Sequence, residues 1–291
     1  MEIRYNEPMS NHTSFRIGGP AEMMVFPDNL PELKHIVSDV RSKDQPVFIL
    51  GKGTNLLVRD GGIKGVVINF MNLNSMKIVK ECEHEILIYI QAGASISDLI
   101  RFSISHGFSG IEFLSGIPGS IGGAICMNAG TAEKGIGNIV ETVTVLTENT
   151  LMRRLRKDEL SFGYRSSNIQ DGWIILSTIL KLVKDDPDRV KERVNKVLAE
   201  RSANQPKWVL CAGSIFKNPS GYTAGKIIDE LGLKGKKIGG AEVSHVHANF
   251  IVNTGNATAS DVIGLIGFIK KKVREARGIE LELEIKIVGD E

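Results

Sequence analysis

Glycine clusters at two places in the chain, and this clustering constrains the fold more than any other feature of the sequence. Four glycines stand within the eight residues 116–123, and a second cluster, 51–55, directly follows an apolar segment. Glycine allows sharp backbone turns and lets backbone N–H groups approach an anion closely. Each cluster therefore predicts either a tight turn at the corner of a subdomain or a phosphate cradle. The presence of both favours a dinucleotide site.

Neither cluster has the spacing of the common nucleotide-binding motifs. The pair Gly51 and Gly53 lacks the third glycine of the Rossmann fingerprint. The chain also contains no Gly-x-x-x-x-Gly-Lys-Ser/Thr sequence. These absences argue against a Rossmann dinucleotide domain and against a P-loop ATPase or GTPase.

Apolar periodicity predicts helices that alternate with strands. Spacing typical of a helix occurs at 29–41, 95–107 and 260–277, and the last of these has an apolar stripe that includes Ala276. Strands are expected at 46–50, 65–70, 85–91, 140–146, 173–183 and 279–288. Asp186 can cap a helix that begins at Pro187, and we place the clearest domain boundary there. The pattern predicts an α+β or α/β protein.

Charge and cysteine content narrow the class of protein. Lys and Arg total 36 against 34 Asp and Glu, a balance that argues against nucleic-acid and membrane partners. The lysine run 270–272 lies in a predicted helix, where we expect a solvated face. Three cysteines without a Cys-x-x-Cys pair argue against a disulfide framework. No apolar run reaches the ~18 residues of a membrane span, so we expect a cytoplasmic protein.

Segments along nearly the whole chain resemble motifs of the UDP-N-acetylenolpyruvoylglucosamine reductases, in the order that this family has them. They are Asn-His-Thr-Ser-Phe-Arg-Ile-Gly-Gly-Pro-Ala at 11–21, the glycine segments 51–55 and 112–119, Tyr-Arg-Ser-Ser at 164–167, Gly-Ser-Ile-Phe-Lys-Asn-Pro at 213–219, His-Ala-Asn-Phe at 247–250 and Leu-Glu-Leu-Glu at 281–284. The length of the chain resembles the shorter class of the family, which lacks an inserted loop with a substrate-binding tyrosine, so Tyr222 is given no such role.

The resemblance implies an α+β fold of the vanillyl-alcohol-oxidase (PCMH) type, with two FAD-binding subdomains at 1–75 and 76–186. A C-terminal α+β substrate domain would occupy 187–291, with its last strand returning to the FAD domain. It also implies NADPH-dependent reduction of UDP-N-acetylglucosamine enolpyruvate through non-covalently bound FAD. We expect a monomer without nucleic-acid or membrane partners.

The motifs also imply roles for individual residues. By resemblance Arg165, Ser214 and Glu284 are catalytic, with Ser214 as the proton donor. Substrate contacts are expected from Lys217, Asn218 and His247. The residues expected to hold FAD are Gly51, Gly53, Thr54, Asn55, Gly116, Pro118, Gly119, Ser120, Gly122, Gly123 and Asn128. No metal is expected, because His245 and His247 have no third ligand in view.

Without the motifs these residues have plainer interpretations. Ser214 follows a glycine and reads as a turn serine, and Arg165 reads as half of a surface ion pair. Glu280, Glu282 and Glu284 alternate with apolar residues, so the sequence alone does not show which of them would be the catalytic glutamate. Two other functions stay open: an oxidase of the same flavoprotein superfamily, and a nucleotide-sugar-binding regulator that has lost catalysis.

Overall fold

The computed structural model describes residues 1–131, 133–206 and 209–291. The chain divides into two units. Unit 1 comprises Met1–Ile3, Val25–Lys52 and Val67–Arg201, and unit 2 comprises Arg4–Met24, Gly53–Val66 and Ser202–Glu291. Both contain helices and strands, in agreement with the predicted α+β class. The finer division at residues 75 and 186 stays a prediction.

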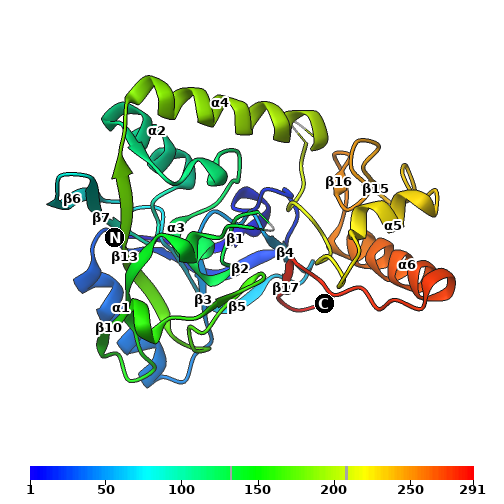
Figure 1. The fold of residues 1–291 in the computed structure, drawn as a ribbon. Helices are drawn as coiled ribbons and strands as arrows, with labels where there is room; N and C mark the ends of the chain where they lie inside the picture. Colours follow the sequence, from blue (N-terminus) through cyan, green and yellow to red (C-terminus); the bar gives the residue numbers. More distant parts are fainter. Residues whose placement is uncertain (132, 207–208) are drawn as a thin grey trace. The chain divides into compact units, whose positions relative to one another are not determined.

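Figure 1 labels the main elements along the chain. Unit 1 holds α1 (Leu30–Ser42), β3 (Val47–Leu50), β6 (Met76–Glu81), β7 (Glu85–Gln91), α2 (Ile96–His106), β8 (Phe108–Ser109), α3 (Ile121–Cys126), β9 (Val140–Leu146), β10 (Met152–Arg156), β11 (Phe162–Gly163), β12 (Ser166–Ser167), β13 (Ile174–Lys184) and, apart from its end, α4 (Pro187–Asn204). Unit 2 holds β4 (Leu56–Val58), α5 (Ala224–Glu230), β14 (Lys237–Ile238), β15 (Ala241–Val243), β16 (Ile251–Asn253), α6 (Ala259–Arg277) and β17 (Lys286–Val288). The strands β1 (Glu2–Pro8), β2 (Pro20–Phe26) and β5 (Ile63–Asn69) have residues in both units. Among the helices so described, none is long and apolar enough to cross a membrane.

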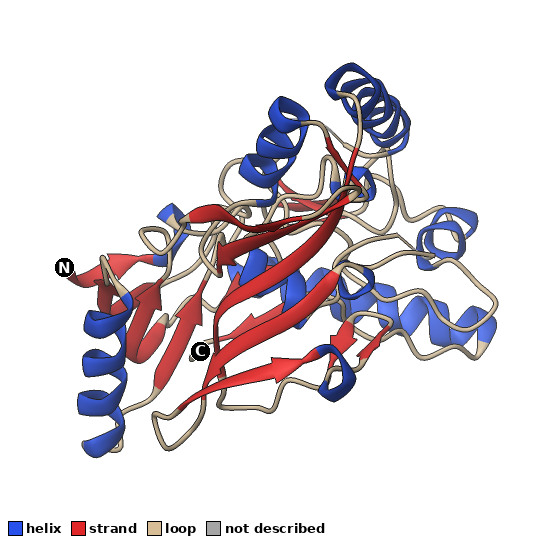
Figure 2. Cartoon of the chain, turned by 60° about the vertical axis from the view of Figure 1, so that its left-hand side comes forward, coloured by secondary structure: helices blue, strands red, loops and turns tan. Residues whose placement is uncertain are grey.

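An antiparallel sheet forms the centre of unit 1. Its strand order is β10-β9-β13-β7-β6, and β8 also pairs with β13. Figure 2 shows its long, twisted strands in red. Ile86, Ile88 and Ile90 of β7 are buried while the residues between them are not, which is the alternation that a sheet covered on one face requires. A second sheet has the order β1-β2-β5-β3.

Local capping signals set the helix ends of unit 1 where the sequence predicts them. Asn29 accepts the Glu32 N–H before α1, and Ser95 accepts the Asp98 N–H before α2. Gly107 ends α2 with a φ of 65°, a left-handed conformation that favours glycine. The predicted helix and strand positions in this unit are therefore confirmed to within one or two residues.

Unit 2 is built around α6 and the three-stranded sheet β14-β15-β16. The stripe predicted for α6 is buried, except that Ala276 is exposed and was wrongly included. The closing strand predicted over 279–288 is also wrong in extent, because only Lys286–Val288 forms a strand, which pairs with β4 in parallel. Before it, the chain makes isolated pairings with residues 215–217 instead of a regular ladder.

Asp60 tethers the start of α6. Its carboxylate accepts the N–H groups of Ala259 and Ser260 at 2.8 and 3.0 Å, and the Ser260 hydroxyl at 2.8 Å. Partial burial alone would raise the pKa of Asp60, but these three bonds outweigh it and hold the pKa below its ordinary value. The carboxylate thus stabilises a helix start that lies far from it in sequence.

Replacing Asp60 by alanine is expected to lower the free energy of unfolding by about 1–2 kcal/mol, the usual cost of a lost helix cap. Because the folded pKa is depressed, this contribution is present above the ordinary pKa of 3.8 and is lost as pH falls through the folded value. Urea unfolding at neutral and acidic pH measures both effects, with the exposed Asp171→Ala as control. Equal stability of the Asp60→Ala variant and the parent at neutral pH would show that the tether contributes nothing.

Candidate active site

The two glycine clusters meet in unit 1. A Cβ built on Gly51 would lie 2.2 Å from the Ser120 Oγ, so a larger residue at position 51 would displace the Ser120 side chain. The same hydroxyl caps α3 by accepting the Gly123 N–H at 3.3 Å. Gly122 packs against Ala92, whose Cβ would lie 2.9 Å from an added Cβ. Close backbone approach therefore explains these glycines.

The outer residues of this segment lie nearer to solvent. Gly116, Pro118 and Gly123 are exposed. Among the residues that the structure describes, no acceptor receives the backbone N–H groups of Gly119 and Ser120. An unpaired N–H needs a partner from water or a ligand. The segment thus fits the pyrophosphate cradle expected of an FAD site.

Arg165 sits at the tip of the hairpin formed by β11 and β12. Its φ of 54° is unusual for a non-glycine residue, and strain of this kind concentrates at functional sites. The guanidinium lies over the Tyr164 ring, 5.1 Å from the centroid. Ser167 fastens the hairpin to the end of α3 by donating to the Cys126 carbonyl at 3.2 Å.

Asn128 makes a second link between the hairpin and the glycine segment. Its Nδ2 donates to the Gly163 carbonyl at 2.9 Å, and its Oδ1 accepts the Gly137 N–H at 3.0 Å. The amide that was expected to contact FAD is thus used within the protein. Its effect is to hold Arg165 close to the glycine-rich segment of unit 1.

The remaining glycine-loop residues belong to unit 2. Gly53 has a φ of 59°, and an added Cβ would lie 2.1 Å from the His12 carbonyl. Asn55 donates from Nδ2 to the Glu284 carbonyl at 3.0 Å and accepts the Lys286 N–H. The division between the units falls after Lys52, so the predicted FAD loop 51–55 contributes Gly51 and Lys52 to one unit and residues 53–55 to the other.

A cavity of about 370 Å³ in unit 2 gathers three predicted residues, Ser214, Asn218 and His247. The other residues that line it are Thr223, Gly225, Lys226, Asp229, Lys234, Val246, Ala248 and Asn249. Asn218 also caps α5, because its Oδ1 accepts the Ala224 N–H at 3.0 Å. Lys217 does not line this cavity and forms an ion pair with Glu282 at 3.2 Å.

Asn249 holds the segment that carries Ser214. The Asn249 carbonyl accepts the Ile215 N–H, and its buried side chain bonds both the N–H and the carbonyl of Phe216, at 3.0 and 2.8 Å. Sequence reasoning did not give Asn249 a role, although it belongs to the His-Ala-Asn-Phe motif. A buried amide with both of its groups paired fixes the backbone on which the Ser214 hydroxyl depends.

His247 is the titratable ring of the cavity. Burial lowers its pKa first, and the positive charge of Lys234 lowers it further, so the neutral ring is favoured. Its Nδ1 accepts the Asn249 N–H at 3.2 Å, which leaves the proton on Nε2. Lys234 pairs with Asp229 at 2.7 Å. Sequence reasoning also missed Lys234, which adds a cation to the lining.

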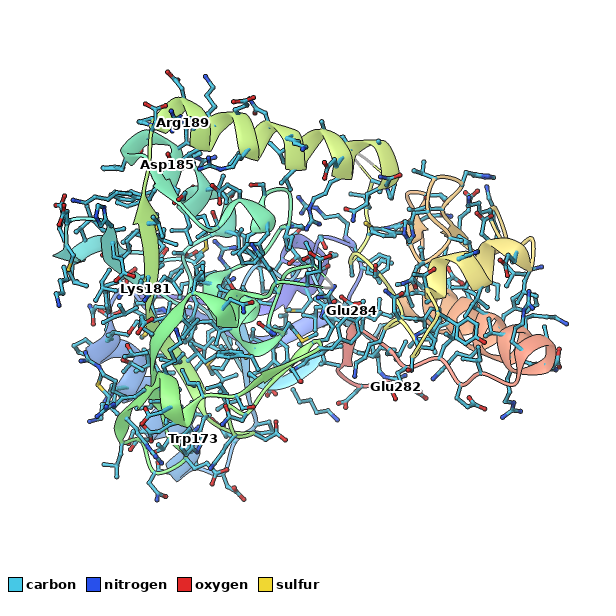
Figure 3. The ribbon with its side chains drawn as sticks, in the orientation of Figure 1. Trp173, Lys181, Asp185, Arg189, Glu282 and Glu284 are labelled. Carbon is cyan, nitrogen blue, oxygen red and sulfur yellow. The ribbon has the colours of Figure 1, made fainter. Side chains whose placement is uncertain are left out.

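The three alternating glutamates differ in their surroundings, as the labels on Glu282 and Glu284 in Figure 3 help to follow. Glu280 and Glu282 are exposed and pair with Arg274 and Lys217, whereas Glu284 is half-buried. The Glu284 N–H donates to the Ile215 carbonyl at 2.8 Å. This bond places Glu284 beside the segment that carries Ser214. The Glu282 carbonyl also bonds this segment, by accepting the Lys217 N–H, so it is partial burial that distinguishes Glu284 from the other two glutamates.

The chain is similar to known proteins along nearly its whole length. A family model of the C-terminal domain of UDP-N-acetylenolpyruvoylglucosamine reductase matches residues 205–288, and a model of an FAD-binding domain matches residues 21–156. The reductase of Caldanaerobacter subterraneus is 45% identical over 290 residues, which cover 99% of this chain and 94% of the relative. The reductase of Clostridium tetani is 40% identical over 99% of this chain and 93% of its own length.

Solved structures show the same likeness. The crystal structure of UDP-N-acetylenolpyruvylglucosamine reductase from Thermus caldophilus aligns with a TM-score of 0.82 at 35% identity, over 98% of both chains. A solvent-stable cholesterol oxidase aligns with a TM-score of 0.51 at 14% identity, over 63% of this chain and 38% of its own. At that identity the second match supports only a shared fold.

Proposed function

Because the chain belongs to the UDP-N-acetylenolpyruvoylglucosamine reductase family, we propose that it performs this family's reaction with the residues described above. It reduces UDP-N-acetylglucosamine enolpyruvate to UDP-N-acetylmuramate, a step of peptidoglycan precursor synthesis that cell-wall growth requires. FAD, when bound, passes the hydride of NADPH to the substrate. The observation that carries the proposal is the single cavity shared by Ser214, Asn218 and His247.

The chemistry explains why these residue types are needed. A hydride added to the terminal carbon of the enolpyruvyl group leaves negative charge that spreads into the carboxylate. A proton added to the neighbouring carbon then completes a lactyl ether. The enzyme must therefore supply a cation for the growing charge and a proton donor for that carbon.

Each role falls to one proposed residue. The Ser214 hydroxyl donates the proton, because it opens into the cavity from a segment that Asn249 holds in place. The Arg165 guanidinium neutralises the charge of the carboxylate and enolate. Glu284 assists beside Ser214 as a protonated or hydrogen-bonded partner, which its half-buried position favours.

The cavity offers groups suited to a nucleotide sugar. Lys234 and Lys226 supply positive charge, and the neutral ring of His247 and the amide of Asn218 supply hydrogen bonds. In unit 1 the glycine segment 116–123 supplies backbone N–H groups for the FAD pyrophosphate. Gly53, Thr54, Asn55, Asn128 and Lys217 complete the proposed set of FAD and substrate residues.

We also propose a cellular location and an oligomeric state for the enzyme. A nucleotide sugar and NADPH are both cytoplasmic metabolites, so the enzyme works in the cytoplasm. We propose that it acts as a monomer. Size-exclusion chromatography with light scattering tests this, and a stable dimer whose disruption abolishes turnover would contradict it.

A half-reaction experiment tests the function. The purified protein should be yellow, NADPH should bleach the flavin absorbance without oxygen, and the enolpyruvyl substrate should then restore it. UDP-N-acetylglucosamine, which has no enolpyruvyl group, is the control and should restore nothing. Rapid recovery of the colour with oxygen but not with the enolpyruvyl substrate would point to an oxidase of the same superfamily.

A further inference from the structure

Arg201, in the last turn of α4, brings a second guanidinium to the glycine segment of unit 1. Its Nη2 donates to the Phe113 carbonyl at 3.2 Å. A Cβ added to Gly116 would lie 3.1 Å from the Arg201 Cδ, so the arginine stem rests directly on this glycine. The side chain is half-buried, and its charged end lies against a loop expected to face the ligands.

Arg201 has no counter-ion in the part of the chain that the structure describes. None of the ion pairs there includes it, although its side chain is partly withdrawn from water. Burial lowers the pKa of Arg201, and the nearby positive charge of Arg165 lowers it further. A partly buried guanidinium without a counter-ion is costly, so the Arg201 side chain favours the binding of an anion.

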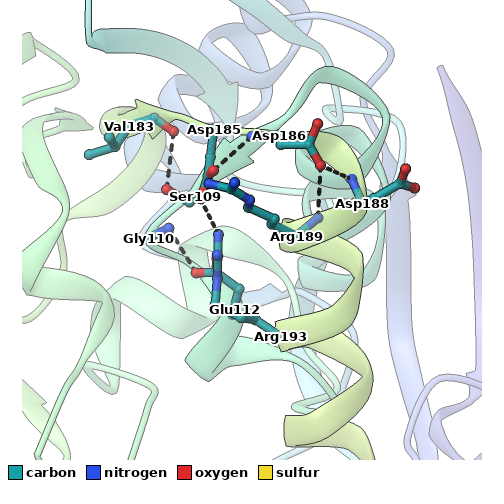
Figure 4. Close-up of polar contacts among 9 residues, drawn as sticks. All are labelled: Ser109, Gly110, Glu112, Val183, Asp185, Asp186, Asp188, Arg189 and Arg193. Carbon is teal, nitrogen blue, oxygen red and sulfur yellow. Dashed lines mark hydrogen bonds and ion pairs between the residues drawn. The ribbon is translucent and has the colours of Figure 1, made fainter.

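Arg193, on the same helix, is an arginine with a structural role and differs from Arg201 in having carboxylate partners. Figure 4 shows its guanidinium between two carboxylates: Nε donates to Glu112 at 2.9 Å and Nη2 to Asp185 at 2.5 Å. The hydrogen bonds that Arg193 donates, first to Glu112 and then to Asp185, raise its pKa, whereas the pKa of Arg201 is lowered. Arg193 already fastens α4 to the start of the loop, so the charge of Arg201 is not needed for that purpose.

We propose that Arg201 forms, together with Arg165, a two-guanidinium site for the carboxylate of the enolpyruvyl substrate. This rests on the proposed function, in which Arg165 meets the same carboxylate. Two guanidinium groups can bind both oxygens of a carboxylate and can also follow the charge as it grows during reduction. The pyrophosphate of FAD is a second oxyanion that Arg201 could bind. Arg201 lies against Gly116, and Gly116 belongs to the predicted FAD loop.

Binding measurements on three variants test the assignment. Arg201→Gln removes the charge, and Arg201→Lys keeps the charge but loses the planar N–H donors of the guanidinium. As a control, Arg189→Gln removes an exposed charge from the same helix. We would titrate the oxidised holoenzyme with the enolpyruvyl substrate and with UDP-N-acetylglucosamine, and follow the flavin absorbance. Arg201→Gln should weaken binding of the enolpyruvyl substrate by roughly ten- to hundredfold, leaving UDP-N-acetylglucosamine within twofold.

A parallel arm separates the two sources of the oxyanion. FAD is added back to the apoenzyme of each variant, and its dissociation constant is measured by fluorescence. Loss of FAD affinity in Arg201→Gln, partly restored in Arg201→Lys, would show that Arg201 binds the FAD pyrophosphate. It would overturn the assignment of Arg201 to the substrate carboxylate. Unchanged binding of every ligand, or equal losses in both Arg201 variants, would overturn any oxyanion role. Failure of the parent enzyme to be reoxidised by the enolpyruvyl substrate would instead refute the proposed function.

Discussion

Replacing Ser214 by alanine is expected to slow flavin reoxidation by the enolpyruvyl substrate about 10²–10⁴-fold, the range that a positioned proton donor supplies. The hydroxyl lies in the cavity of unit 2, on a backbone that Asn249 holds through bonds to Phe216. A serine is a weak acid, but the carbon that it serves is the α-carbon of an enolate and is strongly basic. Stopped-flow absorbance under anaerobic conditions measures the reoxidation directly.

The reduction half-reaction is the internal control for this variant. Bleaching of the flavin by NADPH needs no proton donor to carbon, so Ser214→Ala should leave its rate within about twofold, far below the range expected for reoxidation. Ser220→Ala changes an exposed serine of the same loop and should alter neither half-reaction. If Ser214→Ala slowed both half-reactions equally, the hydroxyl would serve to position the ligands and not to donate the proton.

Replacing Arg165 by glutamine is expected to lower kcat by about 10²–10³-fold, the usual loss when a preorganised donor to a developing anion is removed. The strained φ of 54° and the ties of the hairpin to α3 through Asn128 and Ser167 hold this side chain in place before substrate binds. Preorganisation matters because the protein then need not reorient a cation while charge develops. Steady-state kinetics with saturating NADPH give both kcat and KM.

Two further variants sharpen the interpretation of Arg165. Arg165→Lys keeps the charge but loses the planar pair of donors, so it should recover only part of the lost kcat. Arg154→Gln removes an exposed arginine of β10 and should leave kcat unchanged. A rise in KM without a fall in kcat would mean that Arg165 binds the substrate equally in its ground and transition states.

Many local features of this protein could be predicted because their causes lie within a few residues. Ser95 precedes α2 by one residue and Gly107 follows it by one, so the chemistry of the caps is visible in the sequence. The strand β7 shows its buried face in the alternation of isoleucines. The glycine at position 51 was recognised as part of a loop, although its contact with Ser120 was not visible.

Predictions were wrong where the causes were not local. The segment before β17 reads as a strand, yet only residues 282–284 pair with 215–217, and they form no regular ladder, so tertiary context overrode β-propensity. Ala276 matches the helical period of α6, but it is exposed in the last turn of the helix. Periodicity shows which face of an element is apolar and does not show how far its partner extends.

The sequence by itself determined the class of fold, the helix caps and, through the resemblance of its motifs, the family and the set of residues assigned to chemistry. Only the tertiary structure decided which of three glutamates is half-buried, and that Asn249 holds the segment that carries Ser214. It also showed that Arg201 rests on Gly116 and has no ion-pair partner among the residues that the structure describes. The physical reason is distance along the chain: caps and periodicity act over a few residues. Burial and ion pairing depend on which distant segments meet in space.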